Sequence, residues 1–371
     1  MTVTENYSGC SPARLFSYAE REKNTKRKGL IVNRYQGKHI PVSPSKAIEL
    51  FRRLAGRIPY EENTAVIGFA ETATAIGAQI AESTGSRIYI HTSREDIPEK
   101  FRLITFSEEH SHAVEQNLFS DKGQALFSGI KRIIFADDEI TTGKTILNLS
   151  ECLREKVAPD CKFAAASVIN GMNEENINKF RNNGIELYYL LKIQDSLSDL
   201  SENYASSQEN DIPLSSGRKH LYIRYKKIPD PRLGVNTSEY MSACKETVNN
   251  IALQLSEYLK NCKEIDFIGT EEFMYPVIKL GEEYENRHFE CTTHSTTRSP
   301  IVPCRIENYP LFSRAKLRSF YDRERTTYLY NIRKTDAAVI FTDTENFSEE
   351  TAAGLSSVLM SDKIIFVIPN L

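Results

Sequence analysis

A regular alternation of strand and helix patterns over residues 45–192 constrains the fold of this 371-residue chain more than any other feature. Apolar runs predict strands at 64–70, 87–92, 133–136, 162–170 and 185–192. Amphipathic segments predict helices at 45–58, 73–84, 144–156 and 175–183. We therefore predict an α/β fold with a doubly wound parallel sheet covered on both faces, which binds ligands at the carboxyl ends of its strands.

Composition limits the class of protein. The length predicts two hydrophobic cores rather than one. A formal net charge of −3 gives no general attraction to nucleic acid or to a membrane surface. No apolar run of about 18 residues is present and the first ten residues lack a signal-peptide core. The seven cysteines form no CxxC pair, so we expect a cytoplasmic protein.

A polar segment divides the chain. Residues 194–217 are rich in Ser, Asn and acidic residues and lack periodicity, which predicts a linker between a first domain at 1–193 and a second at 218–371. Residues 15–44 are unusually basic for a chain that is net acidic. An isolated basic stretch is commonly a solvated charge run, but its Tyr, Gly, His and Pro residues favour a structured arm.

The sequence KRIIFADDEITTGKT at 131–145 carries the strongest chemical signal. An apolar strand precedes the acids Asp137 and Asp138, and a turn rich in hydroxyl groups then opens a helix at Lys144. Backbone N–H groups of Thr142, Gly143 and Lys144, with hydroxyls of Thr141, Thr142 and Thr145, would form an anion cradle at that helix N-terminus. The two acids can meet ribose hydroxyls, so the segment predicts a site for a sugar phosphate.

Two comparisons narrow this prediction. A Walker A loop needs a glycine where Asp138 stands, which argues against a nucleotide kinase or ATPase. The arrangement instead resembles the 5-phosphoribosyl 1-diphosphate (PRPP) motif of type I phosphoribosyltransferases. In members of that superfamily that use 6-oxopurines, the position of Thr141 is an aspartate. The resemblance therefore points to an orotate-like or other acceptor.

Two further segments suit a phosphoribosyl donor. The turn that contains Glu71, Thr72, Ala73 and Thr74 follows the first strand and could offer backbone amides to a diphosphate, although a plain helix cap at Thr72 or Thr74 is equally compatible. Arg94 follows the second strand, where a guanidinium can bind phosphate oxygens through two hydrogen bonds. A surface ion pair with a neighbouring acid is the alternative for Arg94.

A long loop is predicted over residues 101–120, and loops of this length are commonly lids. It carries His110 and His112, either of which could protonate or orient groups near the leaving diphosphate. A zinc site built on His-x-His is the less favoured alternative, because no third ligand follows at a useful spacing.

The family resemblance gives the arm a role. Type I phosphoribosyltransferases place a hood over the acceptor base, and residues 1–44 would form that hood here. Arg27, Lys28, Lys38 and His39 would then favour an acidic acceptor such as a pyrimidine carboxylate. The expected partners are PRPP and a small acceptor base, with no nucleic acid and no membrane, and a homodimer is left open.

The second domain contains Thr297-Arg298-Ser299-Pro300, which matches the signature of the TRSP domain. That domain follows an orotate phosphoribosyltransferase-like (PRTase_2) domain in proteins of bacterial tellurite-resistance and stress operons, and the first domain resembles that partner. The resemblance implies a role in making a nucleotide-like metabolite. Arg298 and Ser299 are candidates for binding a second phosphate-bearing molecule or for covering the first site.

The two halves also resemble each other. Residues 265–285 parallel 64–84, the HSTTRSP segment parallels HTSRE, and 337–355 parallel 131–149. The second copy keeps Asp343 and Glu345 but has lost the Thr-Thr-Gly-x-Thr turn. We therefore expect a second α/β domain that is an altered copy of the first and that does not bind PRPP in the same way, the alternative being two unrelated doubly wound domains.

Together these features predict a phosphoribosyltransferase that depends on Mg²⁺, with the ion held mainly by substrate. Asp137 and Asp138 would support the ribose during transfer. Two alternatives stay open at this point. One is a regulatory protein that binds PRPP or a nucleotide without catalysis, and the other is an enzyme that cleaves a nucleotide in the reverse direction.

Overall fold

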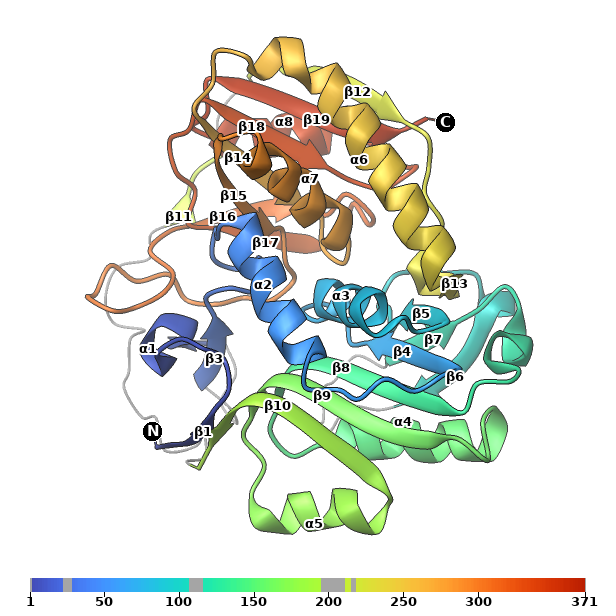
Figure 1. The fold of residues 1–371 in the computed structure, drawn as a ribbon. Helices are drawn as coiled ribbons and strands as arrows, with labels where there is room; N and C mark the ends of the chain where they lie inside the picture. The colour runs from blue at the N-terminus through green and yellow to red at the C-terminus, as the bar shows by residue number, and fades with distance from the viewer. Residues whose placement is uncertain (1, 23–28, 107–115, 195–210, 215–217, 371) are drawn as a thin grey trace. The chain divides into compact units, whose positions relative to one another are not determined.

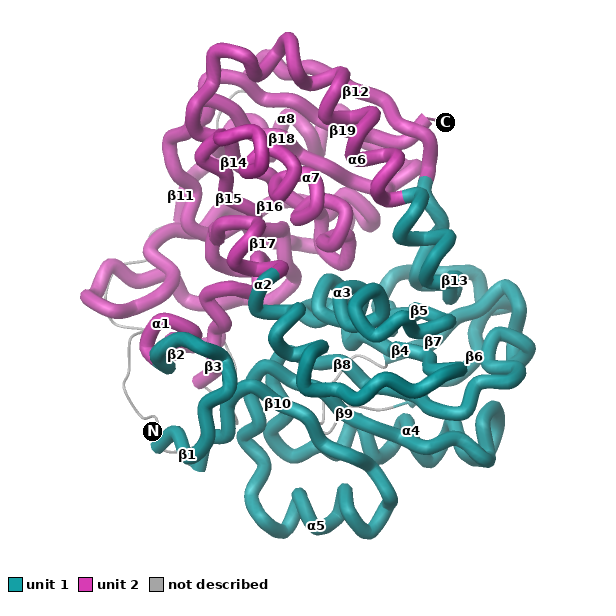
Figure 2. The backbone as a smooth tube through the Cα atoms, in the orientation of Figure 1, with its two compact units in different colours: residues 1–12, 49–195, 228–243 teal, residues 13–48, 196–227, 244–371 magenta. Residues whose placement is uncertain are grey.

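The computed structural model describes residues 2–22, 29–106, 116–194, 211–214 and 218–370. The chain forms two compact units (Figure 2). Unit 1 contains residues 1–12, 49–195 and 228–243, and unit 2 contains residues 13–48, 196–227 and 244–371. The division falls inside three helices, α1 (Pro12–Leu15), α2 (Pro44–Ala55) and α6 (Thr237–Leu259).

Unit 1 is built on a seven-stranded sheet in the order β1-β10-β9-β8-β4-β5-β13. The five central strands are parallel, and the two edge strands are antiparallel to their neighbours. The central strands are β4 (Thr64–Gly68), β5 (Ile88–His91), β8 (Arg132–Ile140), β9 (Lys162–Asn170) and β10 (Ile185–Ile193). The edges are β1 (Val3–Asn6) and β13 (Val235–Asn236). The predicted doubly wound parallel sheet is confirmed.

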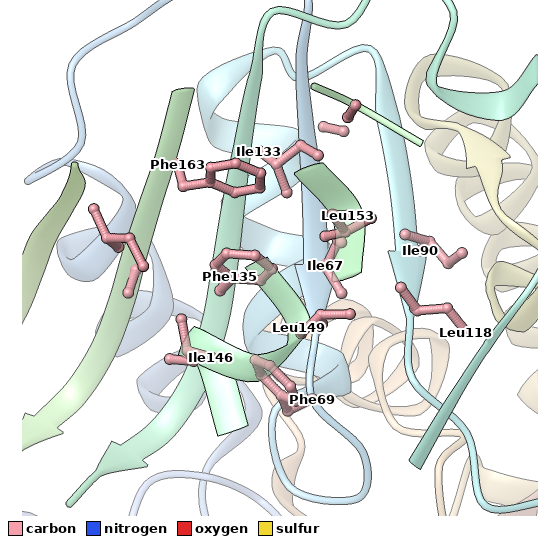
Figure 3. Close-up of a cluster of buried hydrophobic side chains, with 14 of the residues drawn as sticks. Ile67, Phe69, Ile90, Leu118, Ile133, Phe135, Ile146, Leu149, Leu153 and Phe163 are labelled. Carbon is pink, nitrogen blue, oxygen red and sulfur yellow. The ribbon is translucent and has the colours of Figure 1, made fainter. Parts of the chain in front are cut away.

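Helices cover both faces of this sheet (Figure 1). One face packs on α4 (Lys144–Lys156) and α5 (Glu174–Asn182), with a core that includes Phe135, Phe163 and Leu149 (Figure 3). The Phe135 and Phe163 rings are stacked with centroids 5.6 Å apart. The other face carries α3 (Thr74–Thr84), which lies against β4 where Gly77 meets Gly68. The five parallel strands all run toward the same edge of the sheet, and the predicted donor-binding residues follow the ends of β4, β5 and β8 there.

The predicted loop over 101–120 is wrong at both of its ends. Residues there form an antiparallel pair, β6 (Arg102–Phe106) and β7 (Gln116–Phe119), with Phe106 opposite Gln116. Ile104 and Leu118 are buried in the core of unit 1, which explains the pairing. Residues 107–115, including His110 and His112, lie outside the described residues.

Unit 2 is built on a five-stranded parallel sheet in the order β12-β19-β18-β14-β15. The strands are β12 (Leu221–Tyr225), β14 (Glu264–Gly269), β15 (Glu290–Ser295), β18 (Ala337–Phe341) and β19 (Lys363–Pro369). The helix α8 (Glu349–Val358) packs into a core on one face, and α7 (Tyr275–Asn286) packs against β14 and β15. The second domain therefore has the expected α/β character.

The two sheets share one plan. In unit 1 the order β9-β8-β4-β5 corresponds to β19-β18-β14-β15 in unit 2. An antiparallel pair follows the last of these four strands in both cases: β6 and β7 after β5, and β16 (Arg314–Arg318) with β17 (Thr326–Tyr330) after β15. The fifth strand differs, because β10 follows β9 in the chain whereas β12 precedes β14. The two units thus share the order of four strands, as the predicted repeat requires, and differ in this connection.

The units do not follow the boundaries expected from sequence. Residues 13–48, expected to form most of a hood on the first domain, group with unit 2, where β2 (Phe16–Glu20) pairs with β3 (Gly29–Asn33) and Val42 bridges Thr293. Residues 228–243 group with unit 1 and supply β13. Part of the expected linker forms β11 (Asp211–Ile212), which pairs with β16. No helix among the described residues is long and apolar enough to cross a membrane.

Candidate functional site

The acids of the strongest motif lie on a strand rather than in a turn. We expected the strand to end at Ala136, but β8 continues to Ile140 because the long strand β9 pairs with it, with Asp137 opposite Ser167 and Ile140 opposite Asn170. The neighbouring strand β4 ends earlier, opposite Ala136. Asp137 and Asp138 therefore extend past β4 at the carboxyl edge of the sheet.

The two carboxylates make different contacts. Asp138 Oδ1 accepts a hydrogen bond of 2.9 Å from Thr72 Oγ1, in the turn after β4. Asp137 Oδ1 accepts one of 2.8 Å from the backbone N–H of Asp138. Burial raises the pKa of Asp137 well above its ordinary value, and the adjacent Asp138 charge raises it further. The site therefore holds one acid whose charge is disfavoured until a cation or a donor group arrives.

The predicted anion cradle has the expected position. Helix α4 begins at Lys144, its N-cap is Gly143 with φ of 73°, and no side chain of the described residues caps it. Thr142 Oγ1 is 3.4 Å from the Lys144 N–H, at the limit of a hydrogen bond. A Cβ atom at Gly143 would lie 2.3 Å from the buried ring of Phe180, so only glycine fits this turn. The helix start thus has a glycine N-cap and no acid in its first turn, which suits a phosphate.

The turn after β4 is not a plain helix cap. Helix α3 begins at Thr74 with Ala73 as N-cap, and no described side chain caps it. The Thr72 hydroxyl donates to Asp138 instead. Glu71 is buried, and a cis peptide bond joins it to Ala70. The turn that we expected to hold diphosphate is therefore tied to the acids of β8.

Two residues that we did not identify from the sequence hold this turn in place. The buried Thr92 hydroxyl accepts a hydrogen bond of 2.8 Å from the Ala70 N–H and donates one of 2.6 Å to Gln116 Oε1 on β7. The repeat of HTSRE as HSTTRSP was a sequence signal for Thr92, because it places a threonine at the same position in both halves. That second threonine, Thr296, accepts the equivalent hydrogen bond of 3.0 Å from the Glu271 N–H. Gln116 had no such signal.

Arg94 lies two residues beyond Thr92, after the end of β5. It is partly exposed, and Ser93 before it exchanges backbone hydrogen bonds with Asn117 of β7. Because β5, β4 and β8 are adjacent and parallel, Arg94, the turn at 71–74 and the cradle at 141–145 all follow carboxyl ends at one edge. The structure thus brings together the donor-binding residues predicted for the first domain.

The predicted acceptor residues are placed elsewhere. Lys38 and His39 belong to unit 2, and both are buried there. The Lys38 ammonium donates to the Glu271 carbonyl oxygen and lies 3.4 Å from Ser295 Oγ, while the His39 ring packs against Tyr330 with centroids 6.0 Å apart. Arg27 and Lys28 lie outside the described residues. The site described in unit 1 is built without these four residues.

The corresponding edge of unit 2 differs in its helix terminus. The N-cap of α8 is Ser348, whose hydroxyl accepts a hydrogen bond of 3.5 Å from Thr351 N–H, and Glu349 and Glu350 occupy the first turn. Arg298 Nε donates to Glu271 Oε2 at 2.9 Å, and Ser299 forms a turn with its N–H on Thr297 Oγ1. This terminus is closed by its own cap and carries acids, unlike that of α4.

Comparison with protein families decides the identity. Residues 15–196 match the family model PRTase_2, described as phosphoribosyl transferase, and residues 230–359 match the TRSP domain found C-terminal to PRTase_2. Residues 15–196 thus belong to the phosphoribosyl transferase family PRTase_2, and residues 230–359 are a TRSP domain C-terminal to it. The PRTase_2 match includes Asp137, Asp138, Arg94 and the cradle of α4. The resemblance seen in the sequence is confirmed.

Comparison with individual proteins adds weak likenesses. Adenine phosphoribosyltransferase from Trypanosoma brucei is 15% identical over 52% of this chain and 87% of its own, with a TM-score of 0.34. The enzyme from Rhodothermus marinus is 12% identical over 48% and 94%, with a TM-score of 0.36. Orotate phosphoribosyltransferase from Aeropyrum pernix is 15% identical over 48% and 88%, with a TM-score of 0.31. No curated protein matches the chain, so the assignment rests on the family models.

Proposed function

We propose that unit 1 of this PRTase_2 protein transfers the 5-phosphoribosyl group of PRPP to a nitrogen of a small, orotate-like acceptor and releases diphosphate. The observation that carries this proposal is the start of α4, with its Gly143 N-cap and no acid in its first turn, beside the acids of β8. A phosphate bound at Gly143 and a ribose bound at Asp137 and Asp138 would be neighbours, as the 5-phosphate and the ribose are in PRPP. The absence of an aspartate at position 141 favours an acceptor other than a 6-oxopurine.

The transfer exchanges two bonds at C1 of the ribose. The C1–O bond breaks and its electron pair leaves with diphosphate, while the acceptor nitrogen forms a bond to C1 and its proton passes to solvent or to a base. Positive charge develops on the ribose in between. Asp137 and Asp138 would stabilise this charge and hold the ribose hydroxyls, since an anionic Asp137 is disfavoured only while no cation faces it.

The remaining groups would position the donor. The N–H groups and hydroxyls of residues 141–145 would bind the 5-phosphate, and Arg94 with the turn at 71–74 would bind diphosphate. Carboxylates and hydroxyls are the hard oxygen donors that suit Mg²⁺. Held mainly by diphosphate and ribose oxygens, Mg²⁺ would neutralise the leaving group. Among the described residues no group of three or more His, Cys, Asp and Glu side chains could hold a metal ion.

Diphosphate release tests the proposal. The full chain is incubated with PRPP, Mg²⁺ and a panel of bases that includes orotate, and diphosphate is measured for each. We expect release with one acceptor class and a loss of about 10²-fold or more in the Asp137→Asn variant. Binding of PRPP without release under every acceptor would reject catalysis in favour of a regulatory protein. A place in nucleotide-like metabolism linked to tellurite resistance is proposed from the family resemblance alone.

A further inference from the structure

The loops at the carboxyl edge of the unit 2 sheet make backbone hydrogen bonds equivalent to those in unit 1. The N–H of Thr92 donates to the Gly68 carbonyl at 2.9 Å, and that of Thr296 donates to the Gly269 carbonyl at 3.0 Å. Ser93 bridges Asn117, and Thr297 bridges Tyr328. Arg298 therefore occupies the position that Arg94 has in unit 1.

The same correspondence pairs Glu271 with Ala70. The Ala70 N–H donates to Thr92 Oγ1, and the Glu271 N–H donates to Thr296 Oγ1. The small residue directly before the turn proposed to hold diphosphate is thus replaced in unit 2 by an acid. Its carboxylate adds a negative charge next to the arginine of the loop that follows β15.

The Glu271 carboxylate is fully enclosed by donors. Its side chain is 1% exposed. Oε2 accepts from Arg298 Nε at 2.9 Å and lies 3.5 Å from Arg325 Nη2, while Oε1 accepts from the Ser319 hydroxyl. Arg325 and Ser319 come from the segment between β16 and β17, which folds over this edge. Two guanidinium groups and a hydroxyl around one anion form the donor set that also binds a phosphate group.

The backbone indicates that the position of this carboxylate matters. Glu271 has φ of 46°, in the left-handed region that residues other than glycine rarely adopt. Glycine would adopt this conformation without strain and would leave the anion position open. A glutamate in this conformation therefore fits a role for its charge.

We propose that the TRSP unit contains a degenerate anion site that its own Glu271 carboxylate fills, so that Arg298 and Arg325 hold an internal anion in place of a diphosphate. The proposal rests on the proposed function, because it takes Arg94 and the turn at 71–74 as the diphosphate site of unit 1. It gives Arg298 a different role from the binding of a second substrate expected from the sequence. The native unit 2 then binds no diphosphate.

Removal of the carboxylate tests this proposal in the full chain. Glu271→Gly removes the charge and suits the backbone conformation, and Glu271→Gln removes the charge while keeping the hydrogen-bonding shape. Binding of inorganic diphosphate with Mg²⁺ is measured by calorimetry. Glu271→Gly should bind one more diphosphate per chain than the native protein, at least about tenfold more tightly than any residual binding at this site. Glu271→Gln should show no such gain, because its amide still fills the position.

Two further variants test whether the additional diphosphate binds at Arg298. The double variant Glu271→Gly, Arg298→Ala should lose the additional diphosphate. Glu257→Gln, which removes an exposed charge from α6, should leave the native count unchanged. If unit 1 binds no diphosphate, the native protein should bind none per chain, but Glu271→Gly should still bind one. Failure of the proposed function can therefore be distinguished from failure of this inference.

Two results would overturn the inference. One is a native protein that already binds a diphosphate which Arg298→Ala removes. The other is the absence of any gain in Glu271→Gly when a native-like melting temperature shows that this variant is folded. If Glu271→Gly proves unfolded, the number of diphosphates bound by the native protein with and without Arg298→Ala decides between the two readings.

Discussion

At the scale of single residues, the Asp137 carboxylate lies where burial and a neighbouring acid disfavour its charge. Its raised pKa means that the folded state binds the proton more tightly than the unfolded state. The stabilising effect of this proton is present in acid and is lost as the pH rises through the folded pKa. We predict that the free energy of unfolding of Asp137→Asn at neutral pH is higher than that of the native protein by on the order of 1 kcal/mol.

This effect and its pH dependence can be measured by urea unfolding of both proteins between pH 4 and pH 8. The two unfolding free energies should converge toward acid and separate toward neutral pH, while phosphoribosyl transfer is lost in the variant. A variant less stable than the native protein at neutral pH would show that the charged form of Asp137 is favoured by contacts that the structure does not contain.

Thr92 and Thr296 offer a matched pair of tests. Thr92→Val leaves the buried N–H of Ala70 without its acceptor, and Thr296→Val does the same to Glu271, so each should lower the free energy of unfolding by about 1–3 kcal/mol. Only Thr92 fixes the turn proposed to hold diphosphate. Thr92→Val alone should therefore raise KM for PRPP, by about tenfold. Equal changes of KM in both variants would argue against this turn as the donor site.

At the scale of elements, the junction of β8 and α4 depends on Gly143. Gly143→Ala would combine a left-handed backbone with a Cβ atom 2.3 Å from Phe180, so we expect a loss of about 2–4 kcal/mol. Gly184→Ala is the control, because Gly184 has φ of 64° and no atom within 4 Å of an added Cβ. It should lose only about 1–2 kcal/mol in thermal or urea unfolding. Equal losses would mean that contact with Phe180 does not constrain the cradle.

Elements with local signals were predictable from the sequence, and those set by long-range pairing were not. The strand at 162–170 was predicted with its observed bounds because the segment between Lys162 and Asn170 is apolar apart from Ser167. The extension of β8 through Asp137 and Asp138 was missed because acids are poor strand formers and only the pairing with β9 holds them. The cradle of α4 was predictable because Gly143 and the flanking threonines are consecutive. The bond from Thr92 to Gln116 joins residues 24 positions apart and leaves no local pattern.

At the scale of the whole molecule, each unit draws on segments from distant parts of the chain. The sequence indicated two α/β cores and their repeat, but the assignment of 13–48 to unit 2 and of 228–243 to unit 1 depends on contacts such as Val42 with Thr293 and Val235 with Tyr89. Such contacts follow from packing between segments about 150–250 residues apart, which periodicity does not encode. The repeat explains why two similar sheets can carry different sites.

The number of PRPP molecules bound per chain tests the central claim most directly. Calorimetry of the full chain with PRPP and Mg²⁺ should give one site, because the first turn of α4 carries no acid while that of α8 carries Glu349 and Glu350. Thr145→Val should weaken that site by about tenfold through loss of a cradle hydroxyl, and Arg298→Ala should leave it unchanged. Two sites per chain, or a single site weakened by Arg298→Ala and not by Thr145→Val, would contradict the account.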